Sequence, residues 1–394
     1  MTIKDPIHNI IKIEDEIFLE LLSTKEIQRM RFIKQLGMAE FVYPSAVHNR
    51  FCHSVGVFSL ASKIWKKFFN KEKNQNYYLF LSCAILHDVG HGPFSHTFEY
   101  ISKNKFLHEE ITKKIILDPV SEVNKVLKKY EKKLNISLIK EIIEVFDKKY
   151  SDKWIVDLLS SDIDIDRIDY LLRDCYFSGA KYGDFDAKWL ISSMELKNNL
   201  LYFNKNAISA IENYLICRYH MYNAVYCHMK VSGYDFLLCK TIERYIFLYK
   251  NNFVFKNNYF YLIFFVKEEF DLKLFLKLND FNIWSDIYKL VEEKDDVLQK
   301  LSQGFWYRNF FKVISINEKN FHLIEKIKAT FQKNNYNLEY FFGVRQFQLS
   351  IINEKTTSIK ILENDKARDF FEVSNLSKLL TKKIQLNYLF FYEN

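Results

Sequence analysis

Two adjacent side chains, His87 and Asp88, have the types and the placement of ligands to one metal ion. They stand at the end of a nearly continuous apolar run, 77–87, and are followed by Gly90 and Gly92, so a buried helix is predicted to end there in a turn. An imidazole nitrogen beside a carboxylate oxygen suits a divalent ion such as Mn, Mg, Fe or Zn. Because a His-Asp pair is common by chance, other residues must support the assignment.

A second segment offers a cation next to a further metal ligand. Arg50 and His53 lie three positions apart, and therefore on one face if the segment is helical. A buried cation beside a metal ligand is costly in an apolar core but reasonable beside a phosphate. More imidazoles and a carboxylate follow the first pair: His91, His96, Glu99 and His108. Four histidines between positions 87 and 108 exceed what core packing needs.

The acidic segment 162–174 supplies a third group of polar side chains. On a helix, Asp166, Tyr170 and Asp174 fall at i, i+4 and i+8, on one stripe. Taken alone, the segment is more typical of a solvated acidic face that pairs with Arg167 and Arg173. Together with the two histidine-containing segments, it is predicted to line one wall of a pocket.

Helical periodicity dominates the part of the chain that must position these residues. The expected helices, written by number, are 24–36, 53–68, 77–87, 108–117, 138–146, 154–175 and 208–249. After about residue 250 the pattern changes to a mixture of helices (286–311, 321–333), strands (340–352, 358–362, 386–392), a turn at 353–357, a helical turn at 376–381 and one segment, 259–266, that fits a strand or a buried helix. We therefore predict a mainly α protein, with a helical core over 1–250 and a smaller α+β lobe over 251–394 that packs on the core and serves assembly.

Composition narrows the class of protein. A hydrophobic fraction of 48% over 394 residues can form a large core, and only nine glycines and four prolines argue against a disordered chain. Six cysteines without a CxxC pair are typical of free thiols in a reducing compartment. There is no apolar signal core and no run long enough to cross a membrane, so a cytoplasmic location is expected. The net charge of +8 fits a lysine-rich surface; nucleic-acid binding stays open, although no basic tail is present.

The motifs described above resemble those of the HD-domain superfamily. Within it, the chain is similar to the deoxynucleoside triphosphate triphosphohydrolases, which include the SAM-and-HD-domain enzyme of animals and shorter bacterial relatives. The matching segments cover 3–240 in motif detail: 5–8, 33–37, 50–53, 87–96, 108–109, 164–170 and 218–228. The resemblance implies a metal-dependent attack of water on the α-phosphorus, with a deoxynucleoside and tripolyphosphate as products.

The same resemblance implies a role for individual positions. The implied ligands of the divalent metal ion are His53, His87, Asp88 and Asp166. The implied catalytic residues around the α-phosphate are His91, His96, His108 and, as the carboxylate that orients His96, Glu99. The implied phosphate ligands are Arg50, Arg167 and Tyr170. The implied sugar-binding residues are Gln35 and Asp174 at the 3′-hydroxyl and Leu36 and Tyr226 against the ring.

Three positions depart from the pattern of the family. Glu99 replaces a common Asp, and Met229 replaces a common Lys, for which Lys230 is a candidate substitute. Ser23 stands where the animal enzyme uses an Asp to read an activating guanine nucleotide, although Gln28 and Arg31 match. The need for a nucleotide activator is therefore left open.

Other functions remain open at this point. The same metal site could serve an HD-type phosphodiesterase or nucleotide monophosphatase, and a non-catalytic nucleotide-binding regulator is the third alternative. The resemblance also implies a homo-oligomer, a dimer or tetramer, with nucleotide sites between subunits. The residues considered for such contacts are Arg31, Arg308 and Arg345.

Overall fold

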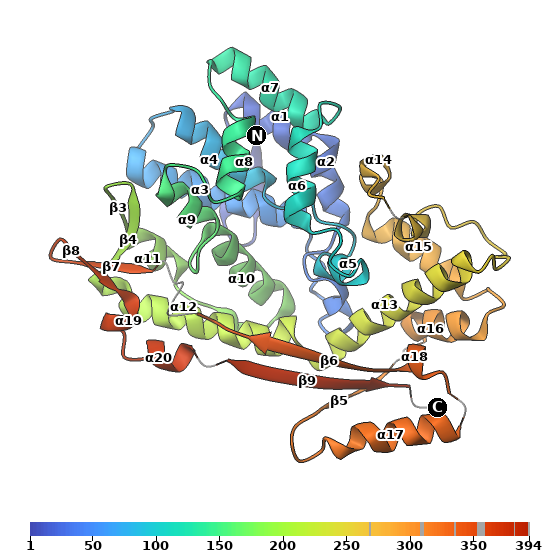
Figure 1. Cartoon of the computed structure of the whole chain (residues 1–394). Coiled ribbons are helices and arrows are strands. Elements are labelled where there is room, and N and C mark those ends of the chain that lie inside the picture. Colours follow the sequence, from blue (N-terminus) through green and yellow to red (C-terminus); the bar gives the residue numbers. More distant parts are fainter. Residues whose placement is uncertain (268, 308–310, 335, 353–358, 382, 393–394) are drawn as a thin grey trace.

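The computed structural model describes residues 1–267, 269–307, 311–334, 336–352, 359–381 and 383–392 (Figure 1). The helices up to residue 250 are α1 (Glu16–Ser23), α2 (Lys25–Arg29), α3 (Arg50–Phe69), α4 (Gln75–Leu86), α5 (His96–Ile101), α6 (His108–Leu117), α7 (Glu122–Leu134), α8 (Ile139–Phe146), α9 (Lys153–Leu159), α10 (Ile165–Ser178), α11 (Ala187–Ser192), α12 (Ile208–Met221) and α13 (Met229–Lys250). The later helices are α14 (Leu272–Phe275), α15 (Asp280–Leu290), α16 (Asp296–Trp306), α17 (His322–Lys333), α18 (Leu338–Phe341), α19 (Phe370–Val373) and α20 (Ser377–Leu380).

Strands are short and form three small sheets. They are β1 (Thr2–Asp5), β2 (Asn9–Lys12), β3 (Met194–Lys197), β4 (Leu200–Asn204), β5 (Lys312–Ser315), β6 (Phe342–Leu349), β7 (Lys360–Glu363), β8 (Lys366–Asp369) and β9 (Ile384–Phe391). The sheet orders are β1-β2, β3-β4-β7-β8 and β5-β9-β6. The mainly α class with a smaller α+β part is confirmed.

The centre of the molecule is the packing of α3 against α4 and α10. Helix α3 begins where the Asn49 side chain accepts a hydrogen bond from the backbone N–H of Cys52, and α4 is buried continuously from Leu79 to Leu86. Gly56 of α3 allows α10 to approach, because a Cβ atom there would lie 1.9 Å from Oδ1 of Asp169. The three helices that carry the predicted metal ligands are thereby fixed on one another.

Three of the helices predicted before residue 250 are wrong in extent. The segment 154–175 is two helices, because the Asp164 side chain caps α10 by accepting from the backbone N–H of Arg167 at 2.7 Å. The run 208–249 is divided between α12 and α13 by a π-helical turn, Tyr222–Tyr226. The segment 24–36 stops being α-helical after Arg29 and continues as a 3₁₀ turn and an extended stretch.

The C-terminal part packs on the core through α13. The Phe236 ring of α13 stacks on Phe390 of β9 at 4.9 Å, and Gly343 of β6 leaves room for that ring. Strand β4 pairs in parallel with β7, so the chain beyond 250 also extends a hairpin of the core. The boundary near 250 stays a prediction. Segment 259–266 contains a 3₁₀ helix, Leu262–Val266, and segment 286–311 contains two helices with a break between them.

Several elements were not anticipated from the sequence, and one prediction cannot be compared. The unanticipated elements include the hairpins β1-β2 and β3-β4, the helices α1, α5 and α7, and the strand β5. The predicted turn 353–357 lies outside the described residues. All six cysteines are free, and five of them are buried. Over the described ranges, no helix has both the length and the apolar character needed to cross a lipid bilayer.

Candidate metal centre and active site

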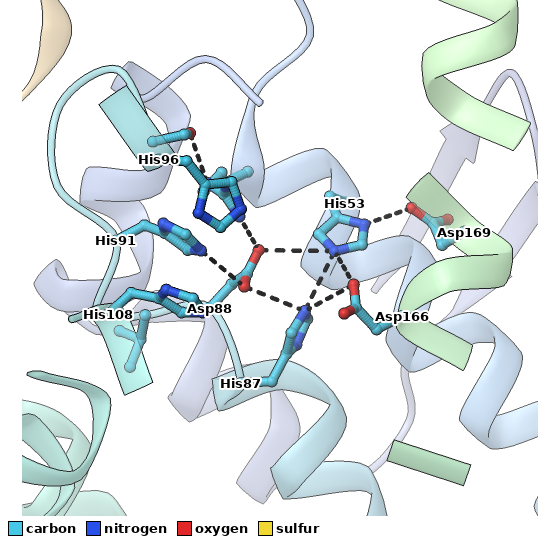
Figure 2. A network of polar contacts seen from close by, with 12 residues as sticks. His53, His87, Asp88, His91, His96, His108, Asp166 and Asp169 are labelled. Atoms are coloured by element: carbon cyan, nitrogen blue, oxygen red, sulfur yellow. Dashed lines mark hydrogen bonds and ion pairs between the residues drawn. The ribbon is translucent and has the colours of Figure 1, made fainter. Parts of the chain in front are cut away.

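The four predicted metal ligands meet where α3, the end of α4 and α10 converge (Figure 2). Nε2 of His53 lies 2.9 Å from Oδ1 of Asp166 and 3.2 Å from Nε2 of His87. Asp88 completes the group, with one carboxylate oxygen 3.6 Å from His53 and the other 3.6 Å from His87. Each ligand thus comes from a helix terminus or first turn that a cap or a glycine turn defines.

The spacing of these donor atoms fits a divalent ion. Metal–ligand bonds of about 2.1 Å place neighbouring donors about 3.0–3.4 Å apart, which is close to the observed separations. Burial alone would lower the pKa of His53, but its hydrogen bonds to Asp166 and Asp169 raise that pKa to about 10. The carboxylates therefore create a potential that favours a cation at Nε2, and mixed nitrogen and oxygen donors suit Mn, Mg, Fe or Zn.

Arg50 contacts Oδ2 of Asp88, whereas His87 lies nearer to Oδ1 of the same carboxylate. Its Nη1 donates a hydrogen bond to Oδ2 of Asp88, and its Nε donates to Oγ of Ser95 at 2.7 Å. Burial opposes ionisation of Asp88, yet Arg50 and the neighbouring imidazoles keep its pKa well below the usual range. Asp88 is therefore a carboxylate shared between a guanidinium and the histidine pair.

A buried polar network behind the ligands orients His53. Nδ1 of His53 lies 2.7 Å from Oδ2 of Asp169, and Nε2 of His8 lies 2.5 Å from Oδ1 of the same carboxylate. Arg173 donates to both oxygens of Asp169 at 2.9 Å and to Asp5 at 2.8 Å. With Nδ1 held in this way, His53 presents Nε2 to the metal position. Sequence reasoning gave Asp169 and His8 no role, although both lie in motifs it recognised.

A second cluster lies on the other side of Asp88 (Figure 2). Glu99 lies 3.0 Å from Nδ1 of His96 and 2.5 Å from Nδ1 of His108, so the longer carboxylate reaches both rings. His91, His96, Glu99 and His108 bring possible ligand atoms within 4.8 Å of one another, but the rings of His91 and His108 stack at 3.8 Å and 14°, so their in-plane lone pairs run nearly parallel and do not converge on one ion. This group therefore suits proton transfer and anion binding better than a second metal.

A pocket begins at His96 and brings together three of the predicted sugar-binding residues. Gln35, Leu36 and Tyr226 line it with His96, and its empty volume is about 470 Å³. The π-helical turn Tyr222–Tyr226 delivers the Tyr226 side chain, whose hydroxyl donates to Oδ2 of Asp174 at 2.8 Å. Oε1 of the buried Gln35 has no hydrogen-bond partner within the described residues. The residues that line the pocket therefore include Gln35, whose Oε1 accepts no hydrogen bond among the described residues, and the aromatic Tyr226.

Two of the predicted phosphate ligands, Arg167 and Tyr170, lie on α10, while the third, Arg50, begins α3. Sequence reasoning missed a further candidate on α12. Arg167 pairs with Asp164, and Tyr170 lies one turn further along the same helix. Arg218 of α12 is 7% exposed, and its Nε and Nη1 atoms have no hydrogen-bond partner within the part of the chain that is described. Burial alone would lower the pKa of Arg218, and the neighbouring Tyr170 phenol is one of the groups that raise it. A buried guanidinium with free donors is a strong candidate for an anion ligand.

The remaining candidates from the sequence do not line the pocket themselves or lie outside the described residues, although Nη1 of Arg345 lies 3.9 Å from Oδ2 of Asp235 in the pocket wall. Met229 is half-buried at the start of α13, and Lys230 is exposed. Arg31 lies on the surface, where its Nε donates to Gln28 at 2.8 Å. Arg345 is not a free surface cation: it stacks over Tyr100 at 4.2 Å. Arg308 lies outside the described residues.

Comparison with known proteins gives consistent relatives. Residues 50–174 match the HD domain, and residues 185–246 match the HD associated region. The uncharacterized protein YwfO of Bacillus subtilis is 34% identical over 325 residues, which are 80% of this chain and 72% of that protein. A deoxynucleoside triphosphate triphosphohydrolase homolog of Dictyostelium discoideum is 28% identical over 60% of this chain and 48% of its own length. A crystal structure of a phosphohydrolase from Bacteroides thetaiotaomicron superposes with a TM-score of 0.85 at 27% identity and covers 100% of both chains.

Proposed function

Since the chain belongs to the HD-domain superfamily of metal-dependent phosphohydrolases, we propose that it hydrolyses deoxynucleoside triphosphates to a deoxynucleoside and tripolyphosphate. The observation that carries the proposal is the pocket that Gln35, Leu36 and Tyr226 line together with His96. It places groups suited to a sugar hydroxyl and a sugar ring next to a histidine suited to proton transfer. Similarity to deoxynucleoside triphosphate triphosphohydrolases supports the same substrate class.

The sugar end of the pocket supports deoxy selectivity. The 3′-hydroxyl would donate its one proton to the Asp174 carboxylate and accept a hydrogen bond from the side-chain amide of Gln35, whose Oε1 has no partner among the described residues. Because Asp174 also holds the Tyr226 hydroxyl and lies 2.7 Å from Nε2 of His48, the Tyr226 ring is fixed where it would exclude a 2′-hydroxyl. A site built to bind a hydroxyl discriminates strongly against an analogue that lacks it.

The phosphate end supplies charge and a proton. A divalent ion held by His53, His87, Asp88 and Asp166 would neutralise charge on the α-phosphate and lower the pKa of a coordinated water. Water would add to the α-phosphorus and lose a proton to bulk solvent as the bond to the 5′ oxygen breaks. Protonated His96 would give its proton to that oxygen and regain one from solvent. His91 and His108 would contact the α-phosphate beside it. Arg50, Arg167, Tyr170 and Arg218 would bind the phosphates.

The role of His96 follows from its surroundings. Glu99 holds Nδ1, so Nε2 is left to carry the mobile proton, and the His96 side chain is 70% exposed and open to a ligand. By contrast, burial together with the nearby Arg50 and His108 lowers the pKa of His91 well below its usual value. Neutral His91 is therefore suited to orient a phosphate oxygen and not to deliver the proton.

A substrate panel tests the proposal directly. Purified protein is incubated with matched deoxy-, ribo- and dideoxynucleoside triphosphates plus Mn, Mg, Fe or Zn, and the phosphate products are separated. Tripolyphosphate from deoxynucleotides is expected, and its formation should stop on chelation and in His53→Ala and Asp166→Ala. Pyrophosphate or orthophosphate would instead indicate the phosphodiesterase or monophosphatase alternative. Nucleotide binding without turnover would indicate a regulator.

Assembly and activation are part of the same proposal. We expect a homo-oligomer, a dimer or a tetramer. Light scattering on the eluting protein, with and without an added guanine nucleotide, measures the mass. A mass of one chain under all conditions would contradict this expectation, and equal activity with and without the nucleotide would exclude an activator.

A further inference from the structure

The start of α15 lies directly behind two loops of the candidate active site, although it lies outside both family matches. Asp280 is the first residue of this helix and is 1% exposed. Its Oδ2 accepts from the backbone N–H of Lys34 at 2.9 Å, and its Oδ1 accepts from the backbone N–H of Phe94 at 2.8 Å. Lys34 precedes Gln35, and Phe94 is two residues before His96. The Asp280 carboxylate therefore connects the segment that carries Gln35 to the segment that carries His96.

The turn that Asp280 holds is strained. Phe94 and Ser95 have φ angles of +61° and +57°, in the left-handed region that residues with a side chain rarely adopt. Such a conformation is unfavourable for a residue with a side chain and persists only where the surroundings fix it. Ser95 is tied by its hydroxyl to the Lys34 carbonyl at 2.6 Å, and the Phe94 N–H is tied by Asp280. The direction in which α5 begins, and with it the position of His96, depends on these bonds.

Two further contacts brace the same helix against the HD turn. Arg29 donates to the carbonyl of Leu278, just before α15, and also to the carbonyls of Val89 and His91 at 3.1 and 2.6 Å. Trp284, one turn into α15, packs edge-on against Phe94 at 5.4 Å. The start of α15 therefore contacts the catalytic loops through a carboxylate, a carbonyl and an aromatic ring. Burial raises the pKa of Asp280 to about 7, while its bonds to the backbone N–H groups of Lys34 and Phe94 and the N-terminus of the helix favour the ionised form.

We propose that Asp280 is a positioning residue for the reaction: it holds the strained Phe94–Ser95 turn so that His96 faces the pocket, and it sets Gln35 against the same pocket. The proposal rests on the proposed function for the roles of His96 and Gln35, while the clamp itself is a property of the fold. It also gives the C-terminal part of the chain a direct function in catalysis.

Asp286 provides a matched control on the same helix. It is equally buried, at 1% exposed, and its Oδ2 accepts from two backbone N–H groups, those of Tyr261 at 2.8 Å and Leu262 at 3.1 Å. That loop takes no part in the pocket. Asp280→Asn replaces one of two accepting oxygens by an NH₂ group and must lose a bond, whereas Asp286→Asn can keep both bonds on its remaining oxygen. Asp286→Asn therefore controls for the loss of a buried carboxylate on the same helix, and the free energy of unfolding is measured for both variants.

The experiment compares the two variants in turnover, metal content and amide hydrogen exchange. Asp280→Asn is expected to lower kcat by about 10–10²-fold with a smaller change in KM, as for a misplaced catalytic group. It should keep its metal and lose exchange protection at the amides of Phe94 and Lys34. Asp286→Asn should keep wild-type kcat and protection at both amides.

Wild-type kcat in Asp280→Asn, or an equal loss in Asp286→Asn, would overturn the proposal. If Asp280→Asn does not fold, Asp280→Glu keeps the charge but shifts the carboxylate by one methylene, and full turnover in that variant would overturn it as well. If the wild-type protein hydrolyses no nucleotide in the panel, the proposed function fails. The exchange measurement then still decides whether Asp280 holds the turn.

Discussion

Asp169→Asn tests whether a residue that orients a predicted metal ligand, without being a ligand itself, contributes to the metal affinity. The substitution keeps the shape of the side chain but removes the charge that faces Nδ1 of His53 at 2.7 Å. Losing such a partner behind a metal-bound histidine weakens metal affinity about 10–100-fold, or about 1.4–2.8 kcal/mol. Breaking a buried ion pair costs about 3–5 kcal/mol of stability, and the lower end applies here because Arg173 keeps Asp5.

The assay measures metal affinity by competition with a chelator and the free energy of unfolding in denaturant. Asp5→Asn is the control, since it removes the other carboxylate of Arg173 without touching His53. It should lower stability and leave the metal affinity unchanged. Wild-type metal affinity in Asp169→Asn, or the same loss of affinity in Asp5→Asn, would refute the argument that Asp169 acts through His53.

Three further outcomes are expected. His96→Ala should keep the metal and lose about 10²–10⁴-fold in kcat, as general acids usually do; loss of the ion on metal analysis would instead point to a two-metal centre. Tyr226→Ala should narrow the preference for deoxy- over ribonucleotides and leave dideoxynucleotides poor substrates; an unchanged ratio in kcat/KM with lower stability would make Tyr226 a packing residue only. Burial alone would lower the pKa of His108, but its hydrogen bond to Glu99 raises it above 6.5. The stability difference between wild type and Glu99→Gln should therefore be present below pH 6.5 and decline as the pH rises through that raised pKa, which unfolding curves at several pH values would measure.

Local sequence signals predicted the parts of the fold that local forces determine. The helices at 53–68, 77–87 and 108–117 correspond to α3, α4 and α6, because each has an apolar face or an apolar run with a defined end. The segment 154–175 was predicted as one helix because apolar periodicity continues across the break. The N-cap at Asp164 divides this segment into two helices. In the sequence, Asp164 is equally compatible with an acidic face of one continuous helix.

The sequence predicted which four candidate ligands lie together, and their metal binding stays a prediction; it did not predict the residues that support them. His53, His87, Asp88 and Asp166 meet as the resemblance implied. The contact between position 280 and positions 34 and 94 depends on tertiary packing, for which a single sequence holds no signal. The same is true of Arg218: it lies in a recognised motif, but only the structure reveals that its side chain is buried with free donors.

The charges of the site argue for a metal ion and a polyanion together. Three buried or half-buried arginines are matched within the chain, since Arg50 pairs with Asp88, Arg167 with Asp164, and Arg173 with Asp169. Two groups lack such a match: Asp166 contacts imidazoles and no guanidinium, and Arg218 has free donors among the described residues. A divalent ion beside Asp166 would balance its carboxylate and leave excess positive charge. The guanidinium of Arg218 would add to that excess. A ligand with several negative charges, such as a triphosphate, would balance this excess positive charge and supply acceptors for the free donors of Arg218.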